Sequence, residues 1–80
     1  MDLADYAEFL IKSICKNPES VKVSTIELED CLMIEIIVDK DDKSAVIGRS
    51  GNTISAIKTL LRVKSYIEHT PKIKINVDSI

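Results

Sequence analysis

The sequence of 80 residues predicts an α+β fold, in which a three-stranded mixed sheet is covered on one face by three helices. Three observations predict this class. Apolar residues recur with helical spacing at the start of the chain and again in its second half. Two apolar runs between them have the composition of strands, and the last segment alternates between apolar and polar residues. A chain of this length buries one small core, so we expect a single domain over residues 1–80.

The first predicted element is a helix over residues 2–16. The Asp2 carboxylate can accept the free N–H groups of its first turn. Pro18 ends it, because the residue before a proline disfavours helical geometry. Its apolar residues recur every three or four positions and share one stripe: Leu3, Tyr6, Ala7, Leu10, Ile11 and Ile14.

Two strands follow, over residues 21–29 and 31–38. In the first strand apolar and polar residues alternate, and a change of parity at Ser24-Thr25 predicts a bulge there. The second strand is almost entirely apolar, which predicts the central position in the sheet. Because only Asp30 separates the two runs, they must pair as an antiparallel hairpin.

The next segment predicts two consecutive helices. An acidic turn over residues 39–42 can cap a short helix over residues 43–47, which Gly48 ends in the left-handed conformation. A long helix begins after Gly51. Its predicted buried stripe contains Ala56, Leu60, Val63 and Ile67, widened by Ile54, Ile57 and Leu61.

Thr70-Pro71 is expected to end the long helix, and a last strand follows over residues 72–78. This strand alternates between apolar and polar residues, which predicts one solvated face. The preceding crossover is long enough to bring it back parallel to the central strand, and such crossovers are right-handed.

The charged residues are divided unevenly along the chain. Residues 1–42 hold four lysines and eleven acidic residues, a net charge of −7. Residues 43–80 hold seven basic and two acidic residues, a net charge of +5. This asymmetry favours one cationic face and an anionic partner, although a chance scatter of solvated lysines would give the same totals.

Several classes of protein are disfavoured. No apolar stretch approaches the roughly 18 residues that span a bilayer, and the start of the chain has no basic run, so we expect a cytoplasmic protein without membrane contact. Cys15 and Cys31 are expected to be reduced thiols. With His69 as the only histidine, no metal or other cofactor is expected. Scattered acidic residues and the lack of a Walker loop disfavour an enzyme.

Both glycines of the chain lie in one loop, Gly48-Arg49-Ser50-Gly51, between the two later helices. Glycines let a backbone turn sharply and approach a ligand closely. The helix after the loop directs its free N–H groups outward, and Arg49 adds a charged fork suited to phosphate oxygens. A phosphate group fits this combination.

Side chains around the loop extend the candidate site. Ile47 and Ile54 can form an apolar floor for bases, and Lys43, Lys58 and Arg62 can line a positive groove. Each feature also has a simpler interpretation. The glycines can merely close a joint between helices, the isoleucines can belong to the core, and the cations can form a solvated face. Like charges four residues apart repel, which slightly favours an anion site at Lys58 and Arg62.

The stretch from Val46 to Gly51, followed by Asn52-Thr53-Ile54 and the helix through Leu61, resembles the KH RNA-binding motif. The element order resembles the type II, bacterial form of the KH fold. Length and layout are similar to the small bacterial single-KH proteins of the KhpA family. The resemblance implies one KH domain over residues 1–80, with its core motif over 31–78. Ser50 and Asn52 stand where family members often carry another basic or long polar side chain.

The resemblance implies a small non-catalytic RNA-binding protein that clamps about four single-stranded nucleotides, as an RNA chaperone or post-transcriptional regulator. By position, Ile47 and Ile54 would contact bases, and the RNA backbone would be contacted by Gly48, Arg49, Ser50 and Gly51, with Asn52 beside them. The resemblance also implies a homodimer, or a heterodimer with a larger KH protein of the Jag/KhpB type. The alternative is a dimerising module with weak RNA binding of its own that works through a partner KH protein. It is motivated by the apolar positions from Ile54 to Ile67, which extend around more than one face of the long helix, and it would associate through this helix or the sheet edge.

Overall fold

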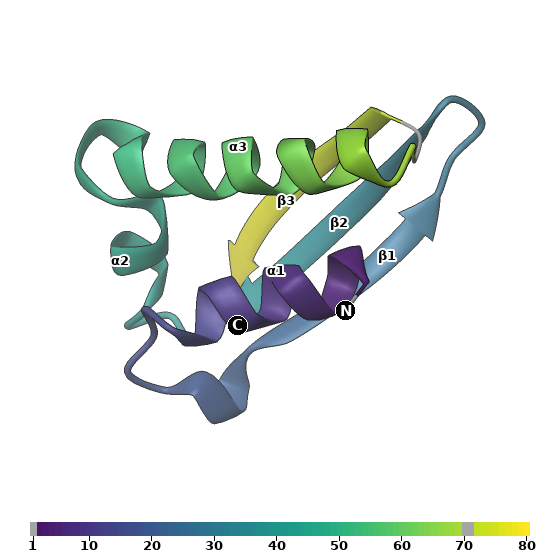
Figure 1. Cartoon of the computed structure of the whole chain (residues 1–80). Coiled ribbons are helices and arrows are strands. Elements are labelled where there is room, and N and C mark those ends of the chain that lie inside the picture. The colour runs from purple at the N-terminus through teal and green to yellow at the C-terminus, as the bar shows by residue number, and fades with distance from the viewer. Residues whose placement is uncertain (1, 70–71) are drawn as a thin grey trace.

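The computed structural model describes residues 2–69 and 72–80, and its elements follow the predicted order (Figure 1). The helices and strands are α1 (Leu3–Lys12), β1 (Lys22–Glu27), β2 (Cys31–Val38), α2 (Lys43–Ile47), α3 (Asn52–Ile67) and β3 (Lys72–Ser79). Two 3-10 turns are added to them, Pro18–Ser20 and Arg49–Gly51. The expected end of the long helix at Thr70-Pro71 lies outside the described residues.

The sheet has the order β1-β2-β3, with the apolar strand β2 in the predicted central position. Strand β2 pairs antiparallel with β1 and parallel with β3. The pairing of β1 is continuous through Ser24-Thr25, so the predicted bulge there is wrong. The parity changes because Val23 packs against the core, whereas Ile26 lies on the opposite, exposed face of the sheet.

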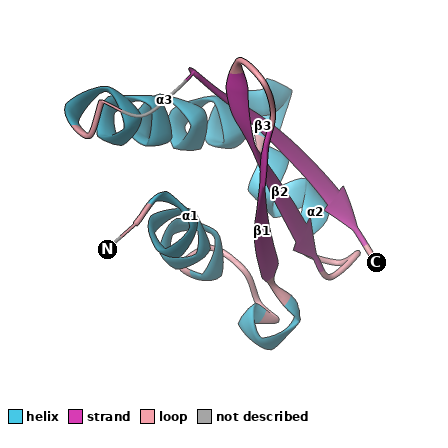
Figure 2. Cartoon of the chain, turned by 90° about the vertical axis from the view of Figure 1, so that its right-hand side faces the viewer, coloured by secondary structure: helices cyan, strands magenta, loops and turns pink. Residues whose placement is uncertain are grey.

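Helices α1 and α3 lie on the same side of the sheet and leave its other face open (Figure 2). Helix α1 packs beside β1 and α3, and α3 packs on β3. The short helix α2 adds Val46 to the core. The buried core consists of Leu3, Ala7, Ile11, Val21, Ile34, Ile36, Val38, Val46, Ile57, Leu61 and Ile73. The expected α+β fold, covered on one face, is confirmed.

Helix α1 is shorter than the predicted helix over residues 2–16. Its start is as predicted, because the Asp5 amide donates to Asp2 Oδ1 at 2.8 Å. Its end comes at Lys12, where the Ser13 hydroxyl donates to the Phe9 carbonyl at 2.7 Å and the chain turns away. A side chain that bonds back to the helix backbone competes with further helical hydrogen bonds. Ile14 is therefore exposed.

Asp42 joins the segment after α1 to the start of α2. It is 1% exposed, and its two carboxylate oxygens accept the backbone N–H groups of Lys16 and Asn17, each at 2.9 Å. The hydrogen bond from Lys16 is the main cause that holds the pKa of Asp42 below its ordinary value, although burial opposes it. The acidic turn over residues 39–42 was expected to cap α2, but Asp42 at the N-cap position makes no capping hydrogen bond with its side chain.

Both cysteines are free thiols, as expected. Burial is the main cause that raises the pKa of the Cys15 thiol, and the negative charge of Asp42 raises it further. Cys31 is buried at the start of β2.

Helix α3 buries only one side of the wide stripe predicted for it. Ile57, Leu61 and Ser65 are buried. The residues expected to form the centre of the buried stripe are exposed: Ala56, Leu60 (44%), Val63 (51%) and Ile67 (68%). The helix has apolar residues on two neighbouring faces, and the sheet covers only one of them.

Candidate nucleic-acid interface

The loop between α2 and α3 is shaped by three residues with positive φ. Gly48 ends α2 at φ 77° and ψ 174°, which is not the left-handed helical conformation expected for it. Ser50 (φ 56°) and Gly51 (φ 77°, ψ 13°) then adopt left-handed geometry. The Gly51 amide donates to the Gly48 carbonyl at 3.2 Å. The loop is thus a tight turn that directs α3 away from α2.

The two glycines have different surroundings. A Cβ atom on Gly48 would lie 2.2 Å from Thr53 Oγ1, so α3 packs directly against this position. A Cβ atom on Gly51 would meet no atom within 4 Å. Gly48 is therefore required by packing within the protein. Gly51 leaves open space at the start of α3.

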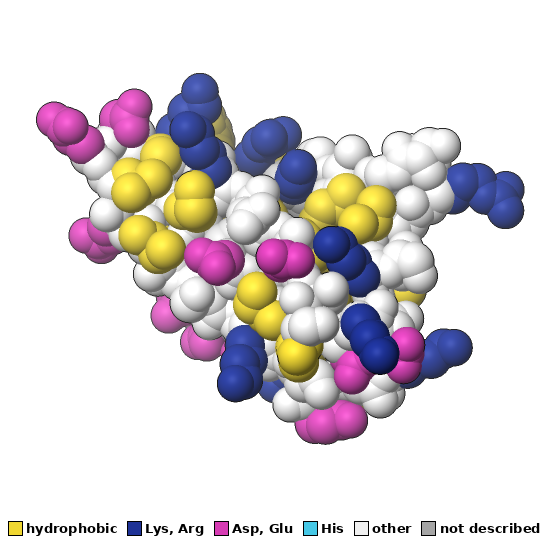
Figure 3. All heavy atoms as spheres, turned by 180° about the vertical axis from the view of Figure 1, so that it is seen from behind, with side chains coloured by type: hydrophobic (Ala, Val, Ile, Leu, Met, Phe, Trp, Pro, Cys, Tyr) yellow, Lys and Arg dark blue, Asp and Glu magenta, His cyan; other side chains and the backbone are white. Residues whose placement is uncertain are grey.

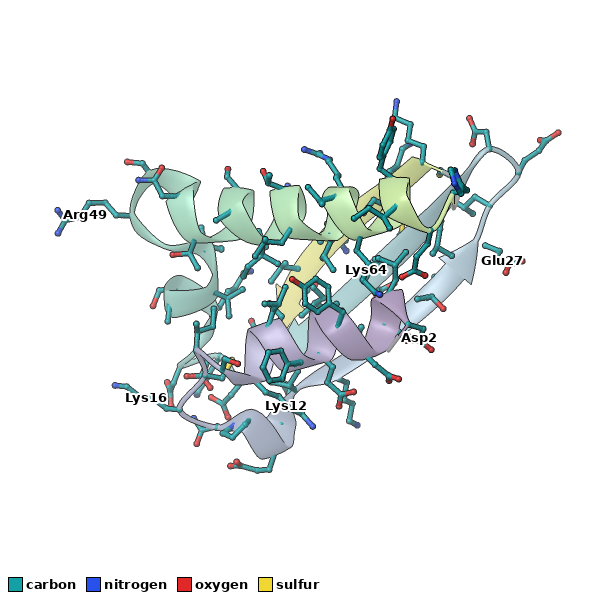
Figure 4. All side chains as sticks on the ribbon, in the orientation of Figure 1. Asp2, Lys12, Lys16, Glu27, Arg49 and Lys64 are labelled. Carbon is teal, nitrogen blue, oxygen red and sulfur yellow. The ribbon has the colours of Figure 1, made fainter. Side chains whose placement is uncertain are left out.

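The start of α3 lacks a side-chain cap. Its N-cap residue is Gly51, and no side chain makes a capping hydrogen bond there. No acidic residue lies in the first turn of this helix. Arg49 and Ser50 are exposed, and the Arg49 side chain extends away from the protein (Figure 4). The combination presents partial and full positive charge to solvent.

The two isoleucines beside the loop are half-buried. Ile54 packs against the core cluster with part of its surface exposed, and Ile47 at the end of α2 is also only partly covered. Ile54 therefore has both a core contact and a solvent-facing part, so its structural and base-contacting interpretations are compatible. Asn52, the first residue of α3, is exposed.

The predicted cations differ in their partners. Lys43 Nζ lies 3.6 Å from Asp78 Oδ1, which links α2 to the end of β3. Within residues 2–69 and 72–80, Arg49, Lys58 and Arg62 form no ion pair. Lys58 and Arg62 lie one turn apart on α3, and Lys58 is only half-exposed.

A second feature is the apolar face of α3, which the sequence indicated as a surface for association. The exposed residues Leu60, Val63 and Ile67 line a cavity of about 280 Å³ together with Tyr6 of α1. Lys64 lies at its border, 5.9 Å from the centre of the Tyr6 ring and paired with Glu68. The signal in the sequence was the number of apolar positions on α3, which exceeds what one face can bury.

Other kinds of site lack support in the described part of the chain. Among residues 2–69 and 72–80, no group of three potential ligands from His, Cys, Asp and Glu is placed to hold a metal ion. None of the helices in these ranges is both long and apolar enough to cross a membrane.

Comparison with known proteins identifies the family of this chain. The family model of the KhpA/KhpB KH domain matches residues 4–78. Proteins named RNA-binding protein KhpA are similar over 59 residues, or 74% of this chain. The protein of Chlamydia caviae is 34% identical, and the matched region spans 76% of its length. Those of Mycobacterium bovis and Streptomyces coelicolor are 37% identical and are covered to 74% and 75%.

Solved structures support the fold. The chain is similar to Era in complex with MgGDPNP and nucleotides 1506–1542 of 16S ribosomal RNA, with a TM-score of 0.74 and 23% identity. It is also similar to a variant of Aquifex aeolicus Era bound to GDP.AlF4−, with a TM-score of 0.73 and 23% identity. In both cases 98% of this chain matches but spans only 30% of Era, so the likeness concerns the fold alone. The element order, the loop over residues 48–51 and the match over residues 4–78 place this chain in the KhpA/KhpB family of KH domains.

Proposed function

We propose that this chain binds single-stranded RNA through the loop over residues 48–51, as a small non-catalytic protein of the cytoplasm. The whole chain would act as one KH domain, with its core motif over residues 31–78. The observation that carries the proposal is the uncapped start of α3 at Gly51, with open space where a side chain would stand. RNA binding is also in the name of its relatives.

The loop would hold the sugar–phosphate backbone. A phosphate oxygen can approach the first turn of α3 because Gly51 has no side chain, and the exposed guanidinium of Arg49 can reach the same oxygens. Ser50 and Asn52 are exposed and add a hydroxyl and an amide next to this position. These contacts carry no base preference, because every nucleotide has the same backbone.

Bases would lie along the half-buried isoleucines. The exposed parts of Ile47 and Ile54 offer an apolar surface on either side of the loop. Lys58 and Arg62 would follow the backbone along α3, whereas Lys43 would contribute less because Asp78 already neutralises it. A groove of this kind holds about four nucleotides. An RNA chaperone or a post-transcriptional regulator would use such short, weakly selective contacts.

Titration of a labelled single-stranded RNA at two salt concentrations tests the proposal. Each phosphate contact contributes about −0.7 to the slope of log affinity against log salt for single strands. The Gly51→Asp variant adds a side chain and a negative charge at the open position, and it should lose most of the affinity. Ser24 is exposed on the edge strand β1, so the control variant Ser24→Asp adds the same negative charge elsewhere and should retain the RNA affinity. Equal affinity of Gly51→Asp and the wild type would falsify the role of the loop.

A second function is favoured by the exposed apolar face of α3. Leu60, Val63 and Ile67, all exposed, would form an interface with a second KH domain, either another copy or a larger KH protein of the Jag/KhpB type. Large apolar side chains gathered on one exposed face commonly mark a protein–protein contact. Sedimentation at micromolar concentration tests self-association, and a clean monomer would count against it.

A further inference from the structure

Strand β3 begins with two lysines that point away from the core. Ile73 is buried, so Lys72 and Lys74 on either side of it lie on the open face of the sheet, where both are exposed. They pair in register with Cys31 and Met33 of β2. Residues two positions apart on a strand are separated by roughly 7 Å, so the two ammonium groups form a local cationic pair.

The acidic residues of the second half are already paired. Glu68 is paired with Lys64, and Asp78 lies 3.6 Å from Lys43. Within the described ranges the remaining cations of this half form no ion pair: Arg49, Lys58, Arg62, Lys72 and Lys74. Their combined charge is therefore available to an anionic partner.

Arg62 lies on the flank of α3 that faces away from α1. The opposite flank carries Leu60 and Val63, which border the cavity shared with Tyr6 of α1. Because α3 packs between α1 and β3, the Arg62 flank lies on the side of β3. The end of α3 lies beside the start of β3, so Arg62 and the pair Lys72 and Lys74 belong to the same end of the molecule (Figure 1).

The view from the open face of the sheet shows the same distribution. Lys and Arg side chains gather along the upper border of this face. Acidic side chains occupy its corner at the upper left and also lie in the middle and along the lower border of the face (Figure 3). The hairpin between β1 and β2 carries Glu29 and Asp30, which are exposed. The cationic border therefore starts beside an acidic tip and continues toward α3.

We propose that RNA longer than four nucleotides continues along α3 and across the start of β3, where Arg62, Lys72 and Lys74 bind its phosphates. This inference rests on the proposed RNA binding by the loop and extends it to a second contact region. From Asn52 to Arg62 the helix rises by about 15 Å, so a strand that leaves the loop along α3 passes Lys58 before it reaches this region. Charge complementarity to phosphate selects RNA as the occupant.

Two RNA lengths and two double variants test the inference. The wild type, Lys72→Gln/Lys74→Gln and Lys16→Gln/Lys22→Gln are titrated with a tetranucleotide and a decanucleotide of single-stranded RNA. Lys16 and Lys22 are exposed lysines far from the start of β3, because Lys22 pairs with Ile37 at the opposite end of β2. Their replacement changes the net charge equally. We expect Lys72→Gln/Lys74→Gln to bind the tetranucleotide like the wild type and the decanucleotide more weakly.

The salt dependence gives the expected size of the effect. Two lost phosphate contacts reduce the slope of log affinity against log salt by about 1.4. When the salt concentration rises fourfold, the factor by which decanucleotide affinity falls should therefore be about seven times smaller in the variant than in the wild type. An unchanged decanucleotide affinity, an equal loss for the tetranucleotide, or an equal loss in Lys16→Gln/Lys22→Gln would overturn the second contact region. If the wild type bound neither RNA, the proposed function itself would fail and this inference with it.

Discussion

Gly48 lies so close to Thr53 that a Cβ atom on the glycine would stand 2.2 Å from the threonine Oγ1. Gly51 has the same φ of 77° and no such neighbour. The two glycines of the loop thus share a backbone requirement and differ in packing. This difference separates the contribution of each glycine to stability from its contribution to binding.

Gly48→Ala should destabilise the protein more than Gly51→Ala. Both variants place a side chain at positive φ, but only the first forces it against α3. Overpacking of this kind costs about 1–3 kcal/mol, so the free energy of unfolding should differ by about that amount. Urea unfolding followed by circular dichroism measures it. Equal losses in the two variants would contradict the close packing at Gly48.

Leu60 and Leu61 should respond differently to truncation. Leu61 is fully buried, and Leu61→Ala should lower the free energy of unfolding by about 2–5 kcal/mol. Leu60 is exposed, and Leu60→Ala in the monomer should change it by less than about 0.5 kcal/mol. Chemical denaturation at low protein concentration gives both values. A larger loss of stability in Leu60→Ala than in Leu61→Ala would show that Leu60 belongs to the core.

Acid should weaken the link between α1 and α2. The pKa of Asp42 is lowered in the folded protein, so its carboxylate stabilises the fold above the ordinary pKa of about 4. That stability is lost as the pH falls from about 4 through the lower pKa of the folded state. Asp42→Asn should lower the free energy of unfolding at pH 7. Between about pH 4 and pH 2 the free energy of unfolding should then fall less in the variant than in the wild type.

Asp41→Asn serves as the control for this pH dependence. Asp41 is exposed, and its neutralisation changes the net charge equally. Urea midpoints measured from pH 7 to pH 2 should therefore follow the wild type. The role of Asp42 would be refuted if both variants showed the same pH profile.

Val63→Glu should prevent association without unfolding the chain. Val63 is half-exposed on the apolar face of α3, so a carboxylate there is solvated in the monomer and buried in an interface. Sedimentation equilibrium at tens of micromolar should show a dimer for the wild type and a monomer for the variant. Thr59→Glu, exposed on the same helix but outside the cavity, should remain dimeric. Loss of the dimer in both variants would indicate a general charge effect.

Local patterns in the sequence were sufficient for the element order. The continuous apolar run of β2 predicted its central position, because burial on both faces removes alternation. The short turn at Asp30 predicted the antiparallel pair, and the long crossover predicted the parallel one. Element ends were less predictable. Ile14 continues the helical period although the chain has already turned at Ser13. The Ser13 hydroxyl ends the helix by donating to the Phe9 carbonyl. Asp42, which is distant in sequence, then holds the N–H groups of Lys16 and Asn17, and no local pattern indicates that contact.

The candidate site was predicted as a contiguous loop, and the structure presents this loop to solvent. The face of α3 was not predictable in the same way. Both Leu60 and Leu61 fit a helical period, and only the position of the sheet decides which of them is covered. Lys43 was grouped with the free cations because Asp78, its partner, lies far along the chain.

The separation of the two flanks of α3 has a consequence for long RNA molecules. If two chains join through Leu60 and Val63, Lys58 and Arg62 of both remain accessible. The pair would then be bivalent, and a transcript engaged by one chain would meet the other at high effective concentration. Linked binding of this kind can raise avidity by roughly 10²–10⁴ without any new contact. Two domains of modest affinity would thus together bind a long RNA stably.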